Sequence, residues 1–421
     1  MDDASGRRGL ESAMPPMMSD SSPHPAATPL PIARPLIGEE EARAVARVLK
    51  TGWVTQGPEV EAFEREFAVY VGAPHACAVS SCTAALHLAL VALEVGAGDE
   101  VITVSHSFIA TANAVRYVHA VPVFVDVDPV NGNILPDQIA AAITPRTRAI
   151  LAVHQLGMPC DLPAILAIAD SRGVPVIEDA ACALGSEIRM GPDAPWERIG
   201  RPRGRIACFS FHPRKILTTG DGGMLTTADA EIHRRLRLLR QHGMSVSDRV
   251  RHAATTVEDE SYEFLGFNYR MTDIQAAIGR VQLSRLPALV QERRARADEF
   301  RRLLSPINGL GLPGEPRWAR SNWQTWFVRL PDGADQKRFR QAMLDRGIAT
   351  RRGVMCAHRE PAYAEAEWRT ISGKASAALR NGESIQDCGV ALPLFPGMSD
   401  VDQSRIADAV RECLVIAGGE G

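Results

Sequence analysis

The chain has 421 residues, of which 45% are apolar and 23% charged, and this length predicts a globular protein of two or more domains. The formal net charge of −3 argues against nucleic acid as the main partner. The most apolar run, residues 84–95, is shorter than the roughly 20 residues that a membrane-spanning helix needs.

Residues 1–28 are rich in Met, Pro, Ser and Ala and show no periodicity, so they predict a disordered leader. They contain no continuous apolar segment of the kind found in signal peptides. The eight cysteines form no CxxC pair, and most lie in apolar segments. This pattern favours reduced thiols in a cytoplasmic protein over disulfides or zinc.

Two helices are expected first, at 39–50 and 59–71, joined by a loop of turn-forming residues. From residue 76 onward, short apolar strands alternate with helices. The expected strands are 76–79, 101–104, 121–127, 148–153, 174–177 and 206–211, and the helices between them are 84–93, 109–118, 136–143 and 162–171. This alternation predicts an α/β domain whose mainly parallel sheet lies between helices, with ligands at the carboxyl ends of the strands.

After residue 223 the expected helices lengthen, at 230–241, 273–286 and 288–304. A connection rich in Pro and Gly follows and predicts a domain boundary. Beyond it we expect strands at 324–330 and 348–351, with helices at 335–346 and 400–416. The predicted organisation is a leader at 1–28, a large α/β domain at 29–305 and a small α+β domain at 306–421.

The edge of the predicted sheet carries residues suited to binding an anion and a cation. Ser81, Cys82 and Thr83 would form the first turn of a helix, where free N–H groups attract anions, although a plain helix cap has the same pattern. Asp179 ends an apolar strand, so its carboxylate needs a partner. That partner could be a protonated pyridine nitrogen or the start of the next helix.

Lys215 lies between an apolar strand that ends in Phe211 and a glycine-rich turn at 220–223. A lysine there can lose part of its hydration and attack a carbonyl group to form a Schiff base, although most lysines at strand ends are simply solvated. Phe108 follows another strand and could stack on a ring or pack in the core. A lysine, a strand-end aspartate and an anion-binding helix start are what pyridoxal phosphate (PLP) requires.

Other chemistries find less support in the sequence. The histidines at 154, 212, 242 and 358 lie in unrelated segments without HxxxH or HExxH spacing, so we predict no metal site. The turn at 220–223 lacks the GxGxxG and Walker patterns of nucleotide-binding loops.

Six motifs now point to a family. They are GWVTQG at 52–57, SSCTAAL at 80–86, EDAA at 178–181, FSFHPRK at 209–215, GDGG at 220–223 and GFNYRMTD at 266–273. In this order they resemble the DegT/DnrJ/EryC1/StrS family of PLP-dependent sugar aminotransferases, from about residue 30 to the last helix. The resemblance implies fold type I: a large domain with a mainly parallel seven-stranded sheet, and a small α+β domain.

The resemblance also implies roles for individual residues. Lys215 would bind PLP as a Schiff base and shuttle a proton, Asp179 would pair with the pyridine nitrogen, and Phe108 would stack on the ring. The implied reaction moves an amino group, with L-glutamate as the expected donor, to a keto group of a nucleotide-linked sugar. A 4-keto-6-deoxy sugar is the expected acceptor, in amino-sugar biosynthesis.

Further positions follow from the same resemblance. Cys82, Thr83 and Ser210 would contact the cofactor phosphate. Asn268 would contact the phosphate bound by a neighbouring subunit, which implies a homodimer with shared active sites. His358 and Tyr363 would lie at the sugar-nucleotide end of the site.

Two residues depart from the family pattern. The family often has glycine at the position of Cys82, and commonly histidine or glutamine at that of Cys182.

Three other functions compete with amino transfer. A PLP-dependent sugar dehydratase would have histidine in place of Lys215, and a non-catalytic sensor would not need Lys215 and Asp179 intact. A cysteine enzyme could use Cys82 at a helix start, but the sequence offers no base beside it.

Overall fold

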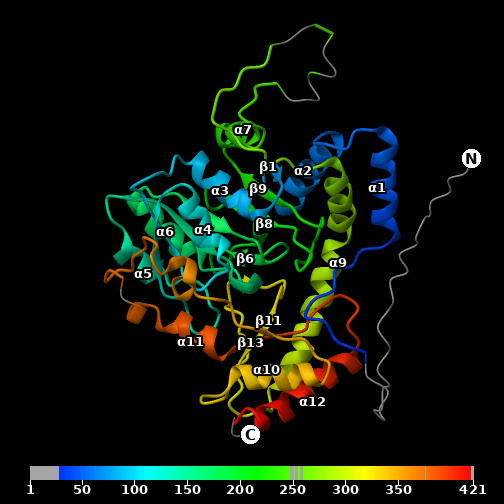
Figure 1. Cartoon of the computed structure of the whole chain (residues 1–421), viewed down its shortest axis with the longest axis vertical. Helices are drawn as coiled ribbons and strands as arrows, with labels where there is room; N and C mark the ends of the chain where they lie inside the picture. Colours follow the sequence, from blue (N-terminus) through cyan, green and yellow to red (C-terminus); the bar gives the residue numbers. More distant parts are fainter. Residues whose placement is uncertain (1–27, 247–250, 252–254, 257–258, 375, 419–421) are drawn as a thin grey trace, which may run out of the picture.

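The structure is a computed structural model that describes the chain except residues 1–27, 247–250, 252–254, 257–258, 375 and 419–421 (Figure 1). The predicted leader at 1–28 therefore lies, apart from its last residue, outside the described residues. In the part of the chain that is described, no helix is long and apolar enough to cross a membrane.

A seven-stranded sheet forms the centre of the molecule, in the order β1-β9-β8-β5-β4-β2-β3. The strands are β1 (His75–Val79), β2 (Glu100–Val104), β3 (Val121–Val125), β4 (Thr147–Val153), β5 (Val176–Asp179), β8 (Ile206–Ser210) and β9 (Gly223–Thr227). Strands β8, β5, β4, β2 and β3 pair in parallel, whereas β9 is antiparallel to both β1 and β8. The mainly parallel sheet predicted from the sequence is confirmed, but β9 was not predicted because its Gly-rich start indicated only a turn.

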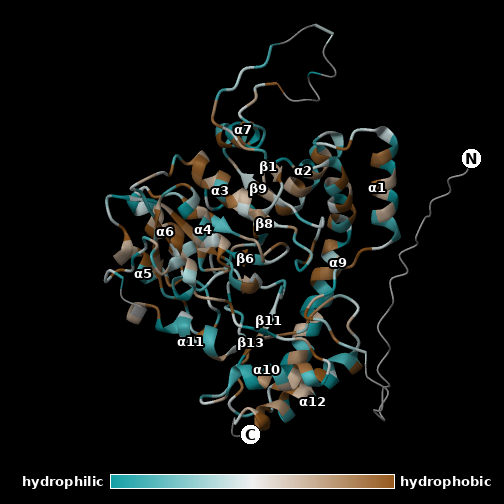
Figure 2. Ribbon diagram, in the orientation of Figure 1, coloured by the Kyte–Doolittle hydropathy of each residue, from teal (hydrophilic) through white to brown (hydrophobic). Residues whose placement is uncertain are grey.

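Helices cover both faces of this sheet, and the strands between them are hydrophobic (Figures 1 and 2). The helices are α1 (Glu39–Thr51), α2 (Pro58–Val71), α3 (Cys82–Ala92), α4 (Ala110–Tyr117), α5 (Pro136–Ala142), α6 (Leu162–Arg172), α7 (Ala230–Leu239) and α9 (Asp273–Leu304). Side chains of α2, α5, α6 and α9 pack in one core cluster, and those of α3, α4 and α7 pack in another. Successive residues of a strand belong to different clusters, as Ala76 and Cys77 do, because successive side chains point to opposite faces of the sheet.

The two helices predicted at 273–286 and 288–304 are one helix, α9, which continues through Pro287. The prediction of two helices was wrong because a proline inside a helix usually breaks or kinks it. Here packing on both sides of Pro287 offsets that cost. Leu286 and Leu289 belong to the core of the large sheet, while Phe300 belongs to the C-terminal core.

The C-terminal part contains a second, antiparallel sheet in the order β11-β13-β12. Its elements are β11 (Trp326–Arg329), α10 (Gln336–Asp345), β12 (Arg351–Arg352), α11 (Arg380–Cys388), β13 (Gly389–Leu392) and α12 (Asp400–Ile416). The central strand β13 and helix α11 were not predicted. Leu30 and the end of α9 pack in the same cluster, so the division into domains at residue 305 stays a prediction.

A third sheet, β10-β6-β7, occupies a region for which we expected only loops. It consists of β6 (Glu187–Arg189), β7 (Trp196–Arg198) and β10 (Ala319–Arg320). These strands are only two or three residues long, which is too short for a periodic sequence signal.

Candidate active site

A cavity of about 820 Å³ opens where β1, β5 and β8 end. One group of lining residues, which we call the strand-end wall, comes from the ends of these strands and from the segments that directly follow them. It consists of Ser81, Cys82, Thr83, Cys182, Ser210 and Lys215. The cavity therefore lies where ligands bind in parallel α/β sheets, at the carboxyl ends of the strands.

Lys215 is held by a loop that folds back on the end of β8. Phe211, directly after β8, is fully buried, and its ring centroid lies 5.4 Å from that of Phe63. Thr218 Oγ1 and Thr219 N–H both donate hydrogen bonds to the Phe211 carbonyl, at 2.9 and 3.0 Å. The aromatic residues before Lys215 thus anchor the strand in the core, and the loop returns the lysine to the cavity.

Gln324 fixes the backbone on both sides of Lys215. Its Oε1 accepts a hydrogen bond from Ile216 N–H at 2.9 Å, and its Nε2 donates one to the Arg214 carbonyl at 2.6 Å. Gln324 is a residue that the sequence analysis did not identify. No local motif marked it, because its partners lie 108 and 110 residues away along the chain.

Asp179 is the last residue of β5, and its side chain is buried, with 4% of the residue exposed. Thr111 Oγ1 donates a hydrogen bond to Oδ2 at 2.8 Å, and Ala181 N–H donates one to Oδ1 at 3.2 Å. Burial raises the pKa of Asp179, although these two hydrogen bonds and the charge of Lys215 act in the opposite direction. A nearby positive charge would stabilise the ionised form of this buried carboxyl group.

The start of α3 is prepared to receive an anion. Ser81 caps the helix by accepting a hydrogen bond from Ala84 N–H at 3.1 Å, which leaves the N–H groups of Cys82 and Thr83 at the cavity. Strand β9 passes so close that a Cβ atom on Gly223 would lie 2.6 Å from the Ser81 carbonyl. Glycine is therefore required at this position of the GDGG motif.

Cys82 does not have the environment of a nucleophile. Burial raises the pKa of its thiol well above the ordinary value, and the nearby Asp179 raises it further. The thiolate, not the thiol, is the reactive form. The geometry thus gives no support to a cysteine enzyme based on Cys82.

A second group of lining residues carries positive charge, and we call it the arginine wall. It consists of Arg214, Arg340, Arg351 and Arg352. Burial lowers the pKa of Arg214, and the like charge of Arg351 lowers it further. Among the described residues that line the cavity, Asp221 is the only carboxylate. No sequence motif indicated this wall, because Arg214, Arg340 and the adjacent pair Arg351 and Arg352 come from three separate segments.

Three residues of the predicted site lie elsewhere. Asn268 is exposed and pairs with Gln241, while His358 and Tyr363 are packed against the β2–α4 region. None of the three is among the described residues that line the cavity. Their roles in phosphate and sugar-nucleotide binding stay predictions.

The surroundings of the last two are those of structural residues. His358 Nδ1 lies 2.6 Å from Ser105 Oγ, and its Nε2 lies 2.9 Å from Glu383 Oε1. Tyr363 donates a hydrogen bond to Asn113 Oδ1 at 2.9 Å, and burial raises its pKa to about 12. A role in substrate binding would need these contacts to change.

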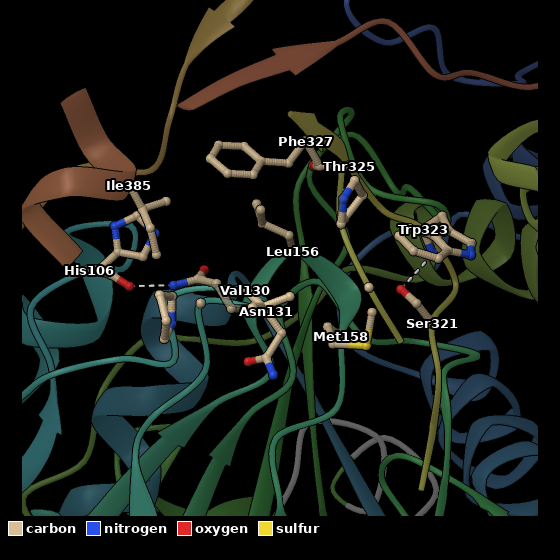
Figure 3. Close-up of a pocket in the computed structure, with 15 residues that line it drawn as sticks. His106, Val130, Asn131, Leu156, Met158, Ser321, Trp323, Thr325, Phe327 and Ile385 are labelled. Carbon is tan, nitrogen blue, oxygen red and sulfur yellow. Dashed lines mark hydrogen bonds between the residues drawn. The ribbon is translucent and has the colours of Figure 1, made fainter. Parts of the chain in front are cut away.

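A pocket of about 30 Å³ adjoins the main cavity (Figure 3). The two share Gln155, Leu156, Thr325 and Phe327 as lining residues. Leu156 has φ of 56°, an unusual value for a residue other than glycine. Ser186 Oγ stabilises this turn by donating to the Gly157 carbonyl at 2.7 Å.

The residues of the strand-end wall fit pyridoxal phosphate together with Asp179, which is buried and is not among the described lining residues. Lys215 supplies an amine, Asp179 a buried carboxylate, and the start of α3 with the Ser210 hydroxyl a phosphate site. Phe108 lines the cavity with 63% of its surface exposed, so its ring is available for stacking. Among the described residues, no group of three or more His, Cys, Asp or Glu could hold a metal ion.

This sheet and this arrangement of lysine, aspartate and helix start define a class, the PLP-dependent enzymes of fold type I. The comparisons identify the family. The model of the DegT/DnrJ/EryC1/StrS aminotransferase family matches residues 35–411, and the chain belongs to this family. Because aminotransferases of this family depend on PLP, the cofactor predicted from the sequence is confirmed.

Individual relatives agree with this assignment. The chain is 38% identical over 387 residues to the spore coat polysaccharide biosynthesis protein SpsC of Bacillus subtilis (strain 168), covering 91% of this chain and 96% of SpsC. It is 34% identical to the aminotransferase TlmJ from Streptoalloteichus hindustanus, with a TM-score of 0.82. It is also 34% identical to S. venezuelae DesV, solved with a ketimine intermediate, with a TM-score of 0.81. Both structural comparisons cover 92% of this chain and 99% of the other.

Proposed function

We propose that this protein transfers an amino group from L-glutamate to the keto group of a nucleotide-linked sugar, with a 4-keto-6-deoxy sugar as the acceptor. The product would be an amino sugar for polysaccharide or glycan synthesis. The observation that carries this proposal is the pairing of two unlike walls in one cavity. The strand-end wall suits the cofactor, and the arginine wall suits a substrate with several negative charges.

The strand-end wall would perform the chemistry. PLP, when bound, supplies an electron sink for the carbon that loses its proton. The amine of Lys215 would take that proton and return it later, as general base and then general acid. Asp179 would supply the negative charge that keeps the pyridine nitrogen protonated. The N–H groups of Cys82 and Thr83, with the Ser210 hydroxyl, would hold the phosphate.

The arginine wall would recognise the substrates. A nucleotide-linked sugar carries a diphosphate, and L-glutamate carries two carboxylates. Arginine binds both kinds of anion through paired hydrogen bonds. The volume of about 820 Å³ is of the size that a large ligand needs.

Assembly and location belong to the same proposal. We expect a homodimer in which Asn268 of each chain contacts the phosphate bound by the other, and a cytoplasmic enzyme. The exposed position of Asn268 supports such a contact.

Product analysis tests the proposal. The purified protein is incubated with PLP, L-glutamate and a panel of nucleotide-linked keto sugars that differ in nucleotide, keto position and the substituent at C6. Mass spectrometry should detect 2-oxoglutarate and an amino sugar in equal amounts. Release of 2-oxoglutarate without an amino sugar from any member of the panel would contradict the proposed acceptor. Loss of a sugar hydroxyl without amine transfer would point to a dehydratase.

A further inference from the structure

The turn after β5 brings Cys182 into contact with Lys215. Nζ of Lys215 donates a hydrogen bond to Sγ of Cys182 at 3.0 Å, and both residues line the cavity. Cys182 is half-buried, as is Cys388, whereas the other six cysteines are buried. The sulfur of Cys182 is therefore in direct contact with the side-chain nitrogen of Lys215 when that nitrogen is not bonded to the cofactor.

One segment braces both partners of this contact. Asn322 Nδ2 donates to the carbonyls of Cys182 and Leu184, each at 2.9 Å. Asn322 Oδ1 accepts a hydrogen bond from Gln324 N–H at 2.8 Å, and Gln324 in turn fixes the backbone beside Lys215. Asn322 and Gln324 thus hold the backbone of both the Cys182 segment and the Lys215 segment, and they fix the two segments relative to each other.

Other titratable groups also surround Lys215. Cys82 lies at the start of α3, Asp179 at the end of β5, and His212 in the same loop as the lysine. Burial lowers the pKa of Lys215, but Cys182 raises it through charge and hydrogen bonding, with smaller effects from Cys82 and Asp179. The balance lies on the side of a raised pKa.

We propose that Cys182 is a positioning residue for Lys215, whose sulfur holds the side-chain nitrogen in place whenever Lys215 is not bonded to the cofactor and favours the protonated form of that nitrogen. This inference rests on the proposed function, in which the amine moves a proton. An ammonium group has three donors and no acceptor, so a sulfur acceptor at 3.0 Å favours the ammonium over the free amine. The position where the family commonly has histidine or glutamine would then keep a polar contact in this chain.

A side chain that only fills space would behave differently. If volume alone mattered, Cys182→Ala and Cys182→Ser would alter Lys215 to a similar extent, because both residues are smaller than cysteine. If the hydrogen bond matters, Cys182→Ser restores much of the wild-type behaviour and Cys182→Ala does not.

The test measures the protonation of Lys215 directly. Full-length protein freed of cofactor is treated with formaldehyde and cyanoborohydride over a series of pH values. This treatment methylates amines in their unprotonated form. Peptide mass spectrometry then gives the extent of labelling at Lys215, with the exposed Lys50 and Lys337 as internal references. Cys388→Ala is the control for loss of a half-buried thiol.

We expect the labelling profile of Lys215 to move to lower pH in Cys182→Ala, with labelling several-fold faster below the wild-type midpoint. Cys182→Ser should lie close to wild type, and Cys388→Ala should coincide with it. A Cys182→Ala profile that coincides with wild type, or equal shifts in the alanine and serine variants, would overturn the inference. Addition of PLP to a separate, unlabelled wild-type sample tests whether Lys215 forms a Schiff base, and so tests the proposed function separately, since the labelling requires no cofactor.

Discussion

The two walls of the cavity differ in the residues that form them and in the charge that they carry. The strand-end wall is built from turns at the edge of the sheet, with one amine, small polar groups and a buried acid behind them. The arginine wall is built from three segments, around Arg214, Arg340 and Arg351–Arg352, and Asp221 is the only carboxylate among the described residues that line the cavity. Under the proposed function this difference corresponds to a division of work, in which the first wall would determine the rate of the chemistry and the second the affinity for anionic substrates. Substitutions in the first wall should therefore lower kcat, and those in the second should raise KM.

The largest effect is expected for Lys215→Ala. Removal of the amine takes away both the covalent link to the cofactor and the group that moves the proton, so the rate should fall by at least about 10³-fold. Some PLP should still bind through the remaining contacts. Release of 2-oxoglutarate measures the rate, and circular dichroism checks the fold. A rate like that of wild type would refute the role of Lys215.

Asp179→Asn should have the next largest effect, a loss in kcat on the order of 10²-fold, because the positive pyridine nitrogen loses its partner.

The same substitution should also change the thermal stability of the protein in a way that depends on pH. Burial raises the pKa of Asp179, so the folded protein favours its neutral form. The contribution of Asp179 to the stability of the wild type is then fully present below the ordinary pKa of 3.8 and is lost as pH rises through the raised value. The cofactor-free variant should therefore gain in melting temperature relative to wild type as pH rises, and a constant difference would contradict this account.

Arg351→Ala tests the second wall. A lost charged hydrogen bond costs about 1.5–3 kcal/mol, so KM for the nucleotide sugar should rise about tenfold or more with little change in kcat. The matched control is Arg359→Ala, since Arg359 pairs with Asp387 at 2.8 Å and is not among the described lining residues. Equal effects of the two substitutions would show that general charge, and not the arginine wall, determines affinity.

Gln324→Ala should have the smallest effect on the reaction, about a few-fold. It leaves the buried Ile216 N–H without its acceptor, which should lower the free energy of unfolding by about 1–3 kcal/mol. Gln341→Ala is the control, because Gln341 is exposed and its hydrogen bond is to Asp345 in the same helix. Chemical denaturation measures both variants, and an unchanged midpoint for Gln324→Ala would refute its role in bracing the Lys215 segment.

The two walls also differ in how far the sequence predicted them. Lys215, Asp179 and the start of α3 lie where parallel strands end, and strand ends can be recognised from short apolar runs. Three of the four arginines of the arginine wall lie in α10 and β12, so the wall depends on how the C-terminal part faces the large sheet, and no local pattern in the sequence encodes that orientation.

The same reasoning explains the missed elements. Strand β13 gives only four residues to the centre of its sheet, and β9 begins inside a glycine-rich turn. Helix α9 was divided at Pro287 because a local rule favoured a break, whereas tertiary packing on both sides of the proline determined the result. The contact of Lys215 with Cys182 likewise depends on Asn322 and Gln324, more than 100 residues away.

The visible absorption spectrum of the purified protein, before and after addition of L-glutamate, tests the central claim most directly. The account predicts an absorption band from PLP bound to Lys215. This band should fade as glutamate donates its amino group and return when a keto-sugar acceptor is added. A band that persists in the presence of glutamate, or no band after incubation with PLP, would contradict the assignment of the strand-end wall as the site of amino transfer.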